Sequence, residues 1–382
     1  MGETVLDFER QQKAKEYARI RHRLLATELA IAVVYVLVLL LAGLSAWFKA
    51  RLLFITHRPV GVIALYFVAF ASGYGLLDFP LSYYSGYVLP HRYGLSTQSL
   101  KSWLADQARG AALSLGIGLA AVEVMYYLLR ACPSIWWLLT GLLFLFFIII
   151  LANLAPLLII PLFFKFKPLE DKELVSRLKS LAERANTRVQ GVFTIDLSAK
   201  TTAANAALMG LGNTRRIVLG DTLLHEYNAD EIETILAHEL GHHLHGDIWH
   251  GIAIQTILTL VGLFLADRLL RWGVIHFAFE GLADVAAFPL VAMAVGGLTI
   301  LTIPLANTYS RWREGLADQF SLEITGKPGA FISSMIRLAN QNLAEAEPEP
   351  WVEFLLYSHP AISKRIQRAQ RFQSSRPEAH PQ

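Results

Sequence analysis

The strongest chemical signal in this 382-residue chain is the segment His238-Glu239-Leu-Gly-His242, a His-Glu-x-x-His pattern. Residues four apart on an α-helix share one face, so the two imidazoles can bind the same metal ion. Glu239 then lies beside that ion, where its carboxylate can take a proton from an attacking water. A hydrolytic zinc site needs three protein ligands and one open position. The pattern therefore predicts one zinc ion per chain. The alternative is a solvated, histidine-rich helix that matches by chance.

The third ligand must come from another segment. The best candidate is Glu314 in Ser310-Arg-Trp-Arg-Glu314-Gly-Leu-Ala-Asp318, where two carboxylates lie four residues apart. On a helix they share one face, so one carboxylate can bind the metal while the other orients a ligating imidazole. A surface helix rich in arginine and carboxylates has the same pattern, so this motif alone leaves both interpretations open.

Composition indicates a membrane protein. Only 17% of the residues are charged and 54% are hydrophobic, with a mean hydropathy of +0.41. Soluble proteins carry about 25% charged residues. The net charge of +3 does not indicate nucleic acid as a partner. The single cysteine, Cys132, permits no intrachain disulfide and excludes a zinc site built from thiolates.

Six apolar segments are long enough to cross a bilayer. They cover residues 24–48, 59–77, 111–129, 135–164, 248–266 and 285–308. The first follows a basic segment, residues 3–23, which predicts an amphipathic helix at the membrane surface rather than a cleavable signal peptide. Residues 91–109 predict a polar loop with a short helix. The positive-inside rule places the amino terminus, this loop and the soluble segments in the cytoplasm, although Lys49, Arg51 and Arg58 are a counter-signal.

The predicted fold is a mainly α membrane protein with six transmembrane helices and a cytoplasmic α+β domain split into two sequence blocks. The expected divisions are 1–164 with four spans, 165–247 with the histidine motif, 248–308 with two spans, and 309–382 with Glu314 and a carboxy-terminal tail.

Within the first soluble block, local patterns predict individual elements. Leucine spacing predicts a helix over 173–184, and β-branched runs predict strands at 191–195 and 216–219. Residues 202–210 are expected to form an edge strand. Asn228-x-x-Glu231 predicts a capping box that opens the helix carrying the motif.

His238-Glu-x-x-His242 followed by Glu314-x-x-Ala-Asp318 resembles the gluzincin pattern of the type I CAAX prenyl proteases, which are integral-membrane zinc metalloproteases. The resemblance extends over about residues 75–370 and includes Pro161 to Leu169, Ser198 to Leu224 and Ser358-His359-Pro360. Asp247 resembles the bacterial branch, where the eukaryotic branch has a histidine. The chain has one predicted span fewer than the eukaryotic relatives.

The resemblance implies a role for each matched residue. The implied roles are metal ligation by His238, His242 and Glu314, general base catalysis by Glu239, orientation of the imidazoles by Asp247 and Asp318, and substrate binding by Asn205, Ala206 and Arg365. The strand that holds Asn205 and Ala206 would pair with an extended substrate through main-chain hydrogen bonds. His359 would stabilise the tetrahedral oxyanion, or else only start a helix as a His-Pro pair.

The resemblance also implies partners and a location. The expected partners are a peptide or protein substrate, lipidated or delivered by the membrane, and the lipid bilayer, with no nucleic acid. The expected location is the bacterial inner membrane, with the site on the cytoplasmic side.

Three other functions are the alternatives to this one. A heat-shock-type protease that degrades misfolded membrane proteins shares part of the pattern. A site-two-type intramembrane protease needs an apolar metal-binding helix, whereas residues 228–233 are polar. A silent, zinc-stabilised membrane chaperone has no use for Glu239, since structural zinc sites close the fourth position.

Overall fold

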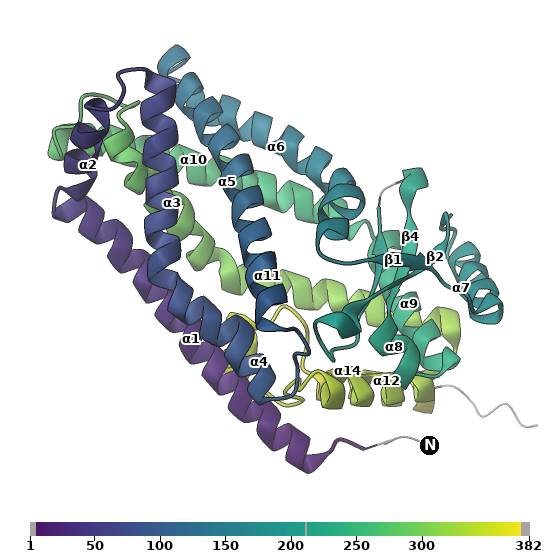
Figure 1. The fold of residues 1–382 in the computed structure, drawn as a ribbon. Helices are drawn as coiled ribbons and strands as arrows, with labels where there is room; N and C mark the ends of the chain where they lie inside the picture. The colour runs from purple at the N-terminus through teal and green to yellow at the C-terminus, as the bar shows by residue number, and fades with distance from the viewer. Residues whose placement is uncertain (1–4, 211, 376–382) are drawn as a thin grey trace, which may run out of the picture.

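Long helices form most of the molecule, and a small α/β domain lies at one end of them (Figure 1). The computed structural model describes residues 5–210 and 212–375. Among them are six helices or helical runs long and apolar enough to cross a membrane: Phe8–Leu41 (α1), Pro59–Arg92 (α3, η1 and α4), Leu100–Ala131 (α5), Trp136–Leu162 (α6, η2 and η3), Asp247–His276 (α10) and Val285–Thr325 (η6 and α11). The prediction of six membrane helices is therefore confirmed.

Three of these helices are longer than the sequence patterns predicted. α1 runs without interruption from Phe8 to Leu41, so the predicted surface helix and the first span are one helix. α5 begins at Leu100, where Ser99 caps it, and includes the short helix expected in the loop. α11 (Phe288–Thr325) continues past the sixth span to Gly326. The reason is that a change from apolar to polar residues does not end a helix when no effective breaker is present.

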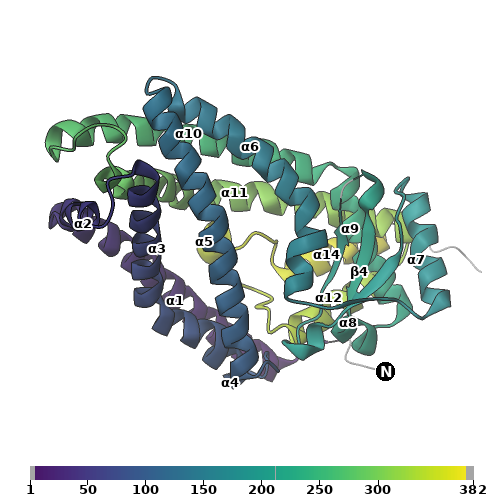
Figure 2. The ribbon, with the colours of Figure 1, turned by 45° about the horizontal axis from the view of Figure 1, so that its top comes forward.

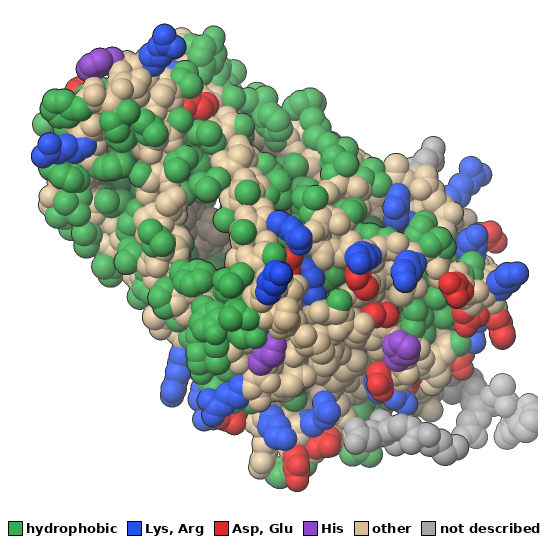
Figure 3. Space-filling model, in the orientation of Figure 1, with side chains coloured by type: hydrophobic (Ala, Val, Ile, Leu, Met, Phe, Trp, Pro, Cys, Tyr) green, Lys and Arg blue, Asp and Glu red, His purple; other side chains and the backbone are tan. Residues whose placement is uncertain are grey.

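The membrane helices pack around a buried apolar core. Its members include Tyr66, Tyr126, Trp136 and Leu290, contributed by α3, α5, α6 and α11. α1, α3 and α5 lie on one side and α6, α10 and α11 on the other (Figure 2). Hydrophobic side chains cover the outside between two charged ends, and the surface is hollowed between α3 and α5 (Figure 3). A short helix, α2 (Leu44–Leu53), connects α1 with α3 at the end far from the α/β domain.

The α/β domain contains a four-stranded sheet with the order β1-β2-β4-β3. The strands are β1 (Phe166–Pro168), β2 (Val192–Ile195), β3 (Ala206–Met209) and β4 (Arg216–Gly220). β2 and β4 are parallel, and the two outer pairs are antiparallel. The three predicted strands are confirmed, and β3 lies at the edge of the sheet as expected. Its other side is therefore available to a further extended chain.

Helices from both sequence blocks complete this domain. They are α7 (Lys172–Arg184), α8 (Asp221–Glu226), α9 (Ala229–Leu244), α12 (Pro328–Gln341), α13 (Pro350–Leu356) and α14 (Ile362–Ser374). The predicted capping box is present: the Asn228 side chain accepts from the main chain of Glu231, whose carboxylate accepts from the Asn228 N–H. This fixes the start of α9, the helix with the His-Glu-x-x-His pattern.

α9 lies against the carboxy-terminal half of α11. Gly241 packs on Ala317, and Ser321 Oγ donates to the Thr234 carbonyl at 2.7 Å. The two candidate motifs, more than 70 residues apart in the chain, are thus side by side.

Polar contacts also hold the amino-terminal helix and the α4–α5 loop against the α/β domain. Arg10 Nη1 donates to the Asn340 carbonyl at 2.8 Å, and Thr97 Oγ1 donates to the Ser198 carbonyl at 2.7 Å. The start of α1, this loop and both sequence blocks of the domain therefore lie at one end of the helices.

Candidate metal centre and catalytic cavity

Three side chains converge between α9 and α11. One potential ligand atom from each of His238, His242 and Glu314 lies within 4.8 Å of the other two. The two Nε2 atoms are 3.1 Å apart, and each is 3.3 Å from a different oxygen of Glu314. The helical spacing of the histidines and the packing of α9 on α11 together produce this group.

The remaining contacts of these side chains suit a divalent metal ion. His238 Nδ1 lies 3.0 Å from Asp318 Oδ1, and His242 Nδ1 lies 2.6 Å from Asp247 Oδ2. Because a carboxylate accepts, both Nδ1 atoms carry the proton, which leaves both Nε2 lone pairs directed at the shared centre. Glu314 Oε2 is buried and accepts no well-aligned hydrogen bond. Two imidazoles and one carboxylate are a donor set that leaves a fourth position open.

The carboxylates favour positive charge at this centre. Burial lowers the pKa of His238, but the nearby carboxylates of Asp318 and Glu314 outweigh it and raise the pKa to about 9. Burial likewise lowers the pKa of His242, and Glu314 overcomes that effect, so the net direction is upward. A position that holds a proton this strongly also suits a metal cation in its place.

Glu239 faces a small cavity beside the three converging side chains. The cavity has a volume of about 170 Å³ and is lined by His238, Glu239 and Arg365, by Asn205 and Ala206 of the β3 side, and by apolar side chains. The apolar lining consists of Ala204, Leu223, Ile235, Phe331, Met335 and Leu338. Burial raises the pKa of Glu239, although the neighbouring histidines oppose the shift. A carboxylate with a raised pKa accepts a proton more readily, as a general base requires.

The start of β3, where the resemblance implied that Asn205 and Ala206 bind substrate, borders this cavity. The main chain of Ala204 exchanges hydrogen bonds with the Asn342 side chain, which donates to its carbonyl and accepts from its N–H. The carbonyl of Asn205 accepts from the Gly220 N–H at 2.9 Å. These bonds fix Asn205 and Ala206 beside Glu239, at the edge of the sheet where an extended peptide can add a strand.

His359 reaches the centre from the segment between α13 and α14. Its Nε2 lies 3.1 Å from Glu314 Oε1, and its side chain is 61% exposed. Arg311 holds this segment in place, since its Nη1 donates to the carbonyls of Glu353 at 2.8 Å and Tyr357 at 2.6 Å. An exposed imidazole so close to the centre is free to contact a bound molecule.

Arg365 lies behind the histidines rather than in front of them. Its Nε is 3.0 Å from Asp318 Oδ2, its Nη2 is 2.6 Å from Oδ1, and the same Nη2 is 3.4 Å from His238 Nδ1. Only 9% of the residue is exposed. The guanidinium therefore orients Asp318, although it also borders the cavity.

The sequence alone did not indicate a role for Arg313, whose guanidinium pairs with Asp247, the carboxylate that also contacts His242. The only feature of the sequence that could have indicated this role is the position of Arg313 next to Glu314. Adjacent helical residues point in different directions, so that signal did not indicate a partner.

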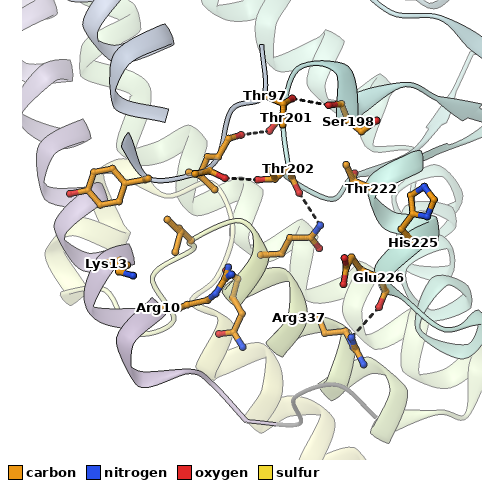
Figure 4. A pocket seen from close by; sticks show the side chains of 16 residues that line it. Arg10, Lys13, Thr97, Ser198, Thr201, Thr202, Thr222, His225, Glu226 and Arg337 are labelled. Atoms are coloured by element: carbon orange, nitrogen blue, oxygen red, sulfur yellow. Dashed lines mark hydrogen bonds between the residues drawn. The ribbon is translucent and has the colours of Figure 1, made fainter. Parts of the chain in front are cut away.

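A larger cleft, of about 840 Å³, lies between α1, the α4–α5 loop and α12 (Figure 4). Several of its hydroxyl groups are engaged with the main chain: Thr97 Oγ1 donates to the Ser198 carbonyl and Thr202 Oγ1 to that of Gly94. Arg337 donates to the Glu226 carbonyl and to the Glu231 carboxylate. None of the candidate metal or catalytic residues lines this cleft, so the chemistry belongs to the smaller cavity.

Comparison with known proteins agrees with this site. The family described as "Peptidase family M48" matches residues 168–373, and "CAAX prenyl protease N-terminal, five membrane helices" matches residues 3–165. The described part of that second region contains four helices long enough to span a membrane, in addition to the ten-residue α2.

Similar proteins include bacterial and eukaryotic members. "Uncharacterized metalloprotease YhfN" of Bacillus subtilis is 32% identical and the match covers 94% of this chain and 85% of that protein. "CAAX prenyl protease 1" of Saccharomyces cerevisiae is 30% identical, and the match covers 76% of this chain and 68% of the yeast protein. The crystal structure of S. mikatae Ste24p has the same fold, with a TM-score of 0.82, 24% identity, and coverage of 95% of this chain and 89% of its own. The chain therefore belongs to peptidase family M48 and is a multi-pass membrane metalloprotease that acts on peptides or proteins.

Proposed function

We propose that the metal is zinc and that the enzyme is an endopeptidase of the CAAX prenyl protease type. The observation that carries this proposal is the convergence of His238, His242 and Glu314 beside Glu239. Two imidazoles and a carboxylate suit zinc, and they leave one position for water or substrate. A zinc ion held by these three residues supplies a Lewis acid that polarises the scissile carbonyl and lowers the pKa of water.

Glu239 is the general base in this proposal. Its carboxylate accepts a proton from the water whose oxygen attacks the carbonyl carbon of the scissile peptide bond. The same proton then passes from Glu239 to the amide nitrogen, the C–N bond breaks, and the products are a carboxylic acid and an amine. The position of Glu239 on the wall of the catalytic cavity supports this role.

The substrate is proposed to bind as an extended chain along β3. Main-chain pairing with Asn205 and Ala206 places a peptide bond beside Glu239, and the apolar wall of the cavity accepts a small apolar side chain. His359 donates a hydrogen bond to the oxyanion that forms during attack. The closeness of its exposed ring to Glu314 supports this position.

A prenylated peptide is the proposed substrate because several relatives carry the name CAAX prenyl protease. The test compares a farnesylated CAAX peptide with the same peptide lacking the lipid, using the purified full-length enzyme. Cleavage of the lipidated peptide at a much higher kcat/KM, abolished by a chelator and restored by zinc, is expected. Equal cleavage of both peptides would favour a quality-control protease, and no cleavage of either would overturn the proposal.

The α/β domain is proposed to face the cytoplasm of a bacterium, with the helices in the inner membrane. The basic start of α1, which contains Arg10, Lys13, Lys15 and Arg19, lies at the same end as this domain and supports the orientation. The test places a cysteine at the exposed position Lys179, in a chain whose native Cys132 is replaced by Ser, and labels it with a reagent that cannot cross the membrane. Labelling in intact spheroplasts would contradict this orientation, and labelling only after lysis is expected.

A further inference from the structure

We infer that Arg313 is a positioning residue that holds His242 in its metal-binding orientation through Asp247. The inference rests on the proposed metal ligation by His238, His242 and Glu314. It adds a residue of this chain on which the affinity for the ion depends.

The contacts form a continuous path from a guanidinium to a ligating imidazole. Asp247 uses its two oxygens for different partners. Its Oδ2 accepts from His242 Nδ1 at 2.6 Å, and its Oδ1 accepts from Arg313 Nε at 2.6 Å and also from Arg313 Nη2. Both partners are well shielded, since 10% of the Arg313 side chain and 19% of that of Asp247 are exposed. Ion pairs and hydrogen bonds shielded from water are stronger than those on the surface.

Arg313 also fixes the main chain at the junction of α9 and α10. Its Nη2 donates to the carbonyl of His245 at 2.6 Å. Gly246 follows in a left-handed conformation with φ 68°, and α10 begins at Asp247. One guanidinium therefore binds the end of the helix that carries His242 and the first carboxylate of the next helix. Since Asp247 lies beyond this turn, its position relative to His242 depends on the turn being held.

The orientation of His242 determines whether it can bind metal. While Asp247 accepts from Nδ1, the proton stays on that atom and the lone pair on Nε2 faces Glu314. If Asp247 rotates away, the imidazole can carry its proton on Nε2 instead and then has no lone pair for the ion. Arg313 prevents this because it occupies the other oxygen of the same carboxylate and limits its rotation.

Each ligating histidine is supported in the same way. His238 donates to Asp318, which Arg365 binds through two nitrogens, and His242 donates to Asp247, which Arg313 binds through two nitrogens. Arg313 directly precedes the third ligand, Glu314. A single turn of α11 therefore supplies one ligand and fixes the direction of another.

The test measures zinc affinity by competition with a chelator, using the purified full-length protein and the variants Arg313→Gln, Arg313→Lys and Asp247→Asn. Loss of an outer partner of a metal ligand weakens binding by about 10- to 100-fold. We expect this loss in Arg313→Gln and Asp247→Asn, with KM unchanged for the zinc-loaded enzyme. Arg313→Lys should recover part of the affinity, because lysine keeps the charge next to Asp247 but lacks the planar fork that also reaches the His245 carbonyl.

Arg268→Gln is the matched control. Arg268 pairs with Asp267 at 2.5 Å on the same helix as Asp247, about 30 Å away along the helix axis. It should leave the zinc affinity unchanged even if it lowers the unfolding temperature. A loss of affinity in this control as large as that in Arg313→Gln would show a general effect of stability and overturn the inference.

A double variant tests whether the two residues act in one path. Arg313→Gln combined with Asp247→Asn should weaken zinc binding no more than Asp247→Asn alone, whereas losses that multiply would contradict the path. If wild-type protein binds zinc and Arg313→Gln binds it equally well, the inference fails and the proposed function stands. If wild-type protein binds no zinc, both fail.

Discussion

Gly241 of α9 faces Ala317 of α11 with little room for a side chain: a Cβ at position 241 would lie 3.0 Å from the Ala317 Cα and 3.2 Å from Phe320 Cδ1. This close approach brings His238 and His242 within reach of Glu314 on the facing helix. The geometry of the metal centre therefore depends on the distance between two helix backbones.

Gly241→Ala should push α9 away from α11. Overpacking of a tightly packed contact costs about 1–3 kcal/mol, so the free energy of unfolding is expected to fall by that amount and the zinc affinity to fall with it. Unfolding by denaturant in detergent micelles and chelator competition measure the two effects. Gly251→Ala is the control, because a Cβ there would meet nothing within 4 Å. Equal behaviour of the two variants would show that the contact is not tight.

Glu239→Gln should remove the proposed base while keeping its shape. A positioned general base contributes about 10²- to 10⁴-fold to the rate, so kcat is expected to fall by at least the lower of these factors. Zinc content should stay at the wild-type level, because Glu239 is not one of the three converging ligands. Glu323→Gln, at an exposed position on α11, serves as the control. Turnover by Glu239→Gln at the wild-type rate would exclude the proposed mechanism.

His359→Ala distinguishes a residue that contacts substrate from a fourth ligand. Loss of one donor to the oxyanion lowers kcat by about 10²- to 10³-fold. The expected result is such a fall with an unchanged zinc affinity and an unchanged unfolding temperature, since the ring is 61% exposed. A marked loss of zinc affinity would instead make His359 a ligand. Unchanged kcat would return it to the interpretation of a simple His-Pro helix start.

Much of the site was predictable because its key spacings are local. A spacing of four positions from His238 to His242, and again from Glu314 to Asp318, defines shared helix faces without knowledge of the fold. The capping box at Asn228 and the edge strand at Ala206 are local in the same sense. Hydropathy identified the six membrane helices, because a span needs only a sufficiently long apolar run.

The parts that the sequence did not predict depend on contacts between distant segments. The bond between Arg313 and Asp247 joins residues 66 positions apart, and no local spacing indicates it. The sequence also did not predict that α1 and α11 are each one uninterrupted helix, and the reason is different. α1 and α11 cross from polar to apolar surroundings without an effective breaker, so the helix boundary and the membrane boundary do not coincide.

Glu233 of α9 forms ion pairs with two other segments of the α/β domain. These ion pairs predict how the stability of the domain depends on pH. Glu233 Oε2 accepts from Arg177 Nη2 of α7 at 2.7 Å and from Lys327 Nζ, just before α12, at 2.5 Å. Burial raises the pKa of Glu233, but these two cations outweigh it, and the net pKa is below the usual 4.5. A folded-state pKa below the unfolded value stabilises the protein above the unfolded pKa, and this stabilisation is lost as pH falls through the folded pKa.

Glu233→Gln should therefore lower the free energy of unfolding near neutral pH but not in acid. Hydrogen bonds to charged groups contribute about 1.5–3 kcal/mol, so a loss of up to this size is expected at pH 7. The difference in the free energy of unfolding between the variant and wild type should shrink below pH 4.5 and disappear once Glu233 is protonated in the folded protein as well.

Asp230→Asn is the matched control, since Asp230 binds the same two cations but is 52% exposed and should contribute less. Unfolding curves for both variants across this range measure the effect. A loss in Glu233→Gln that is the same in acid and at neutral pH would show that packing, and not charge, connects α7, α9 and α12.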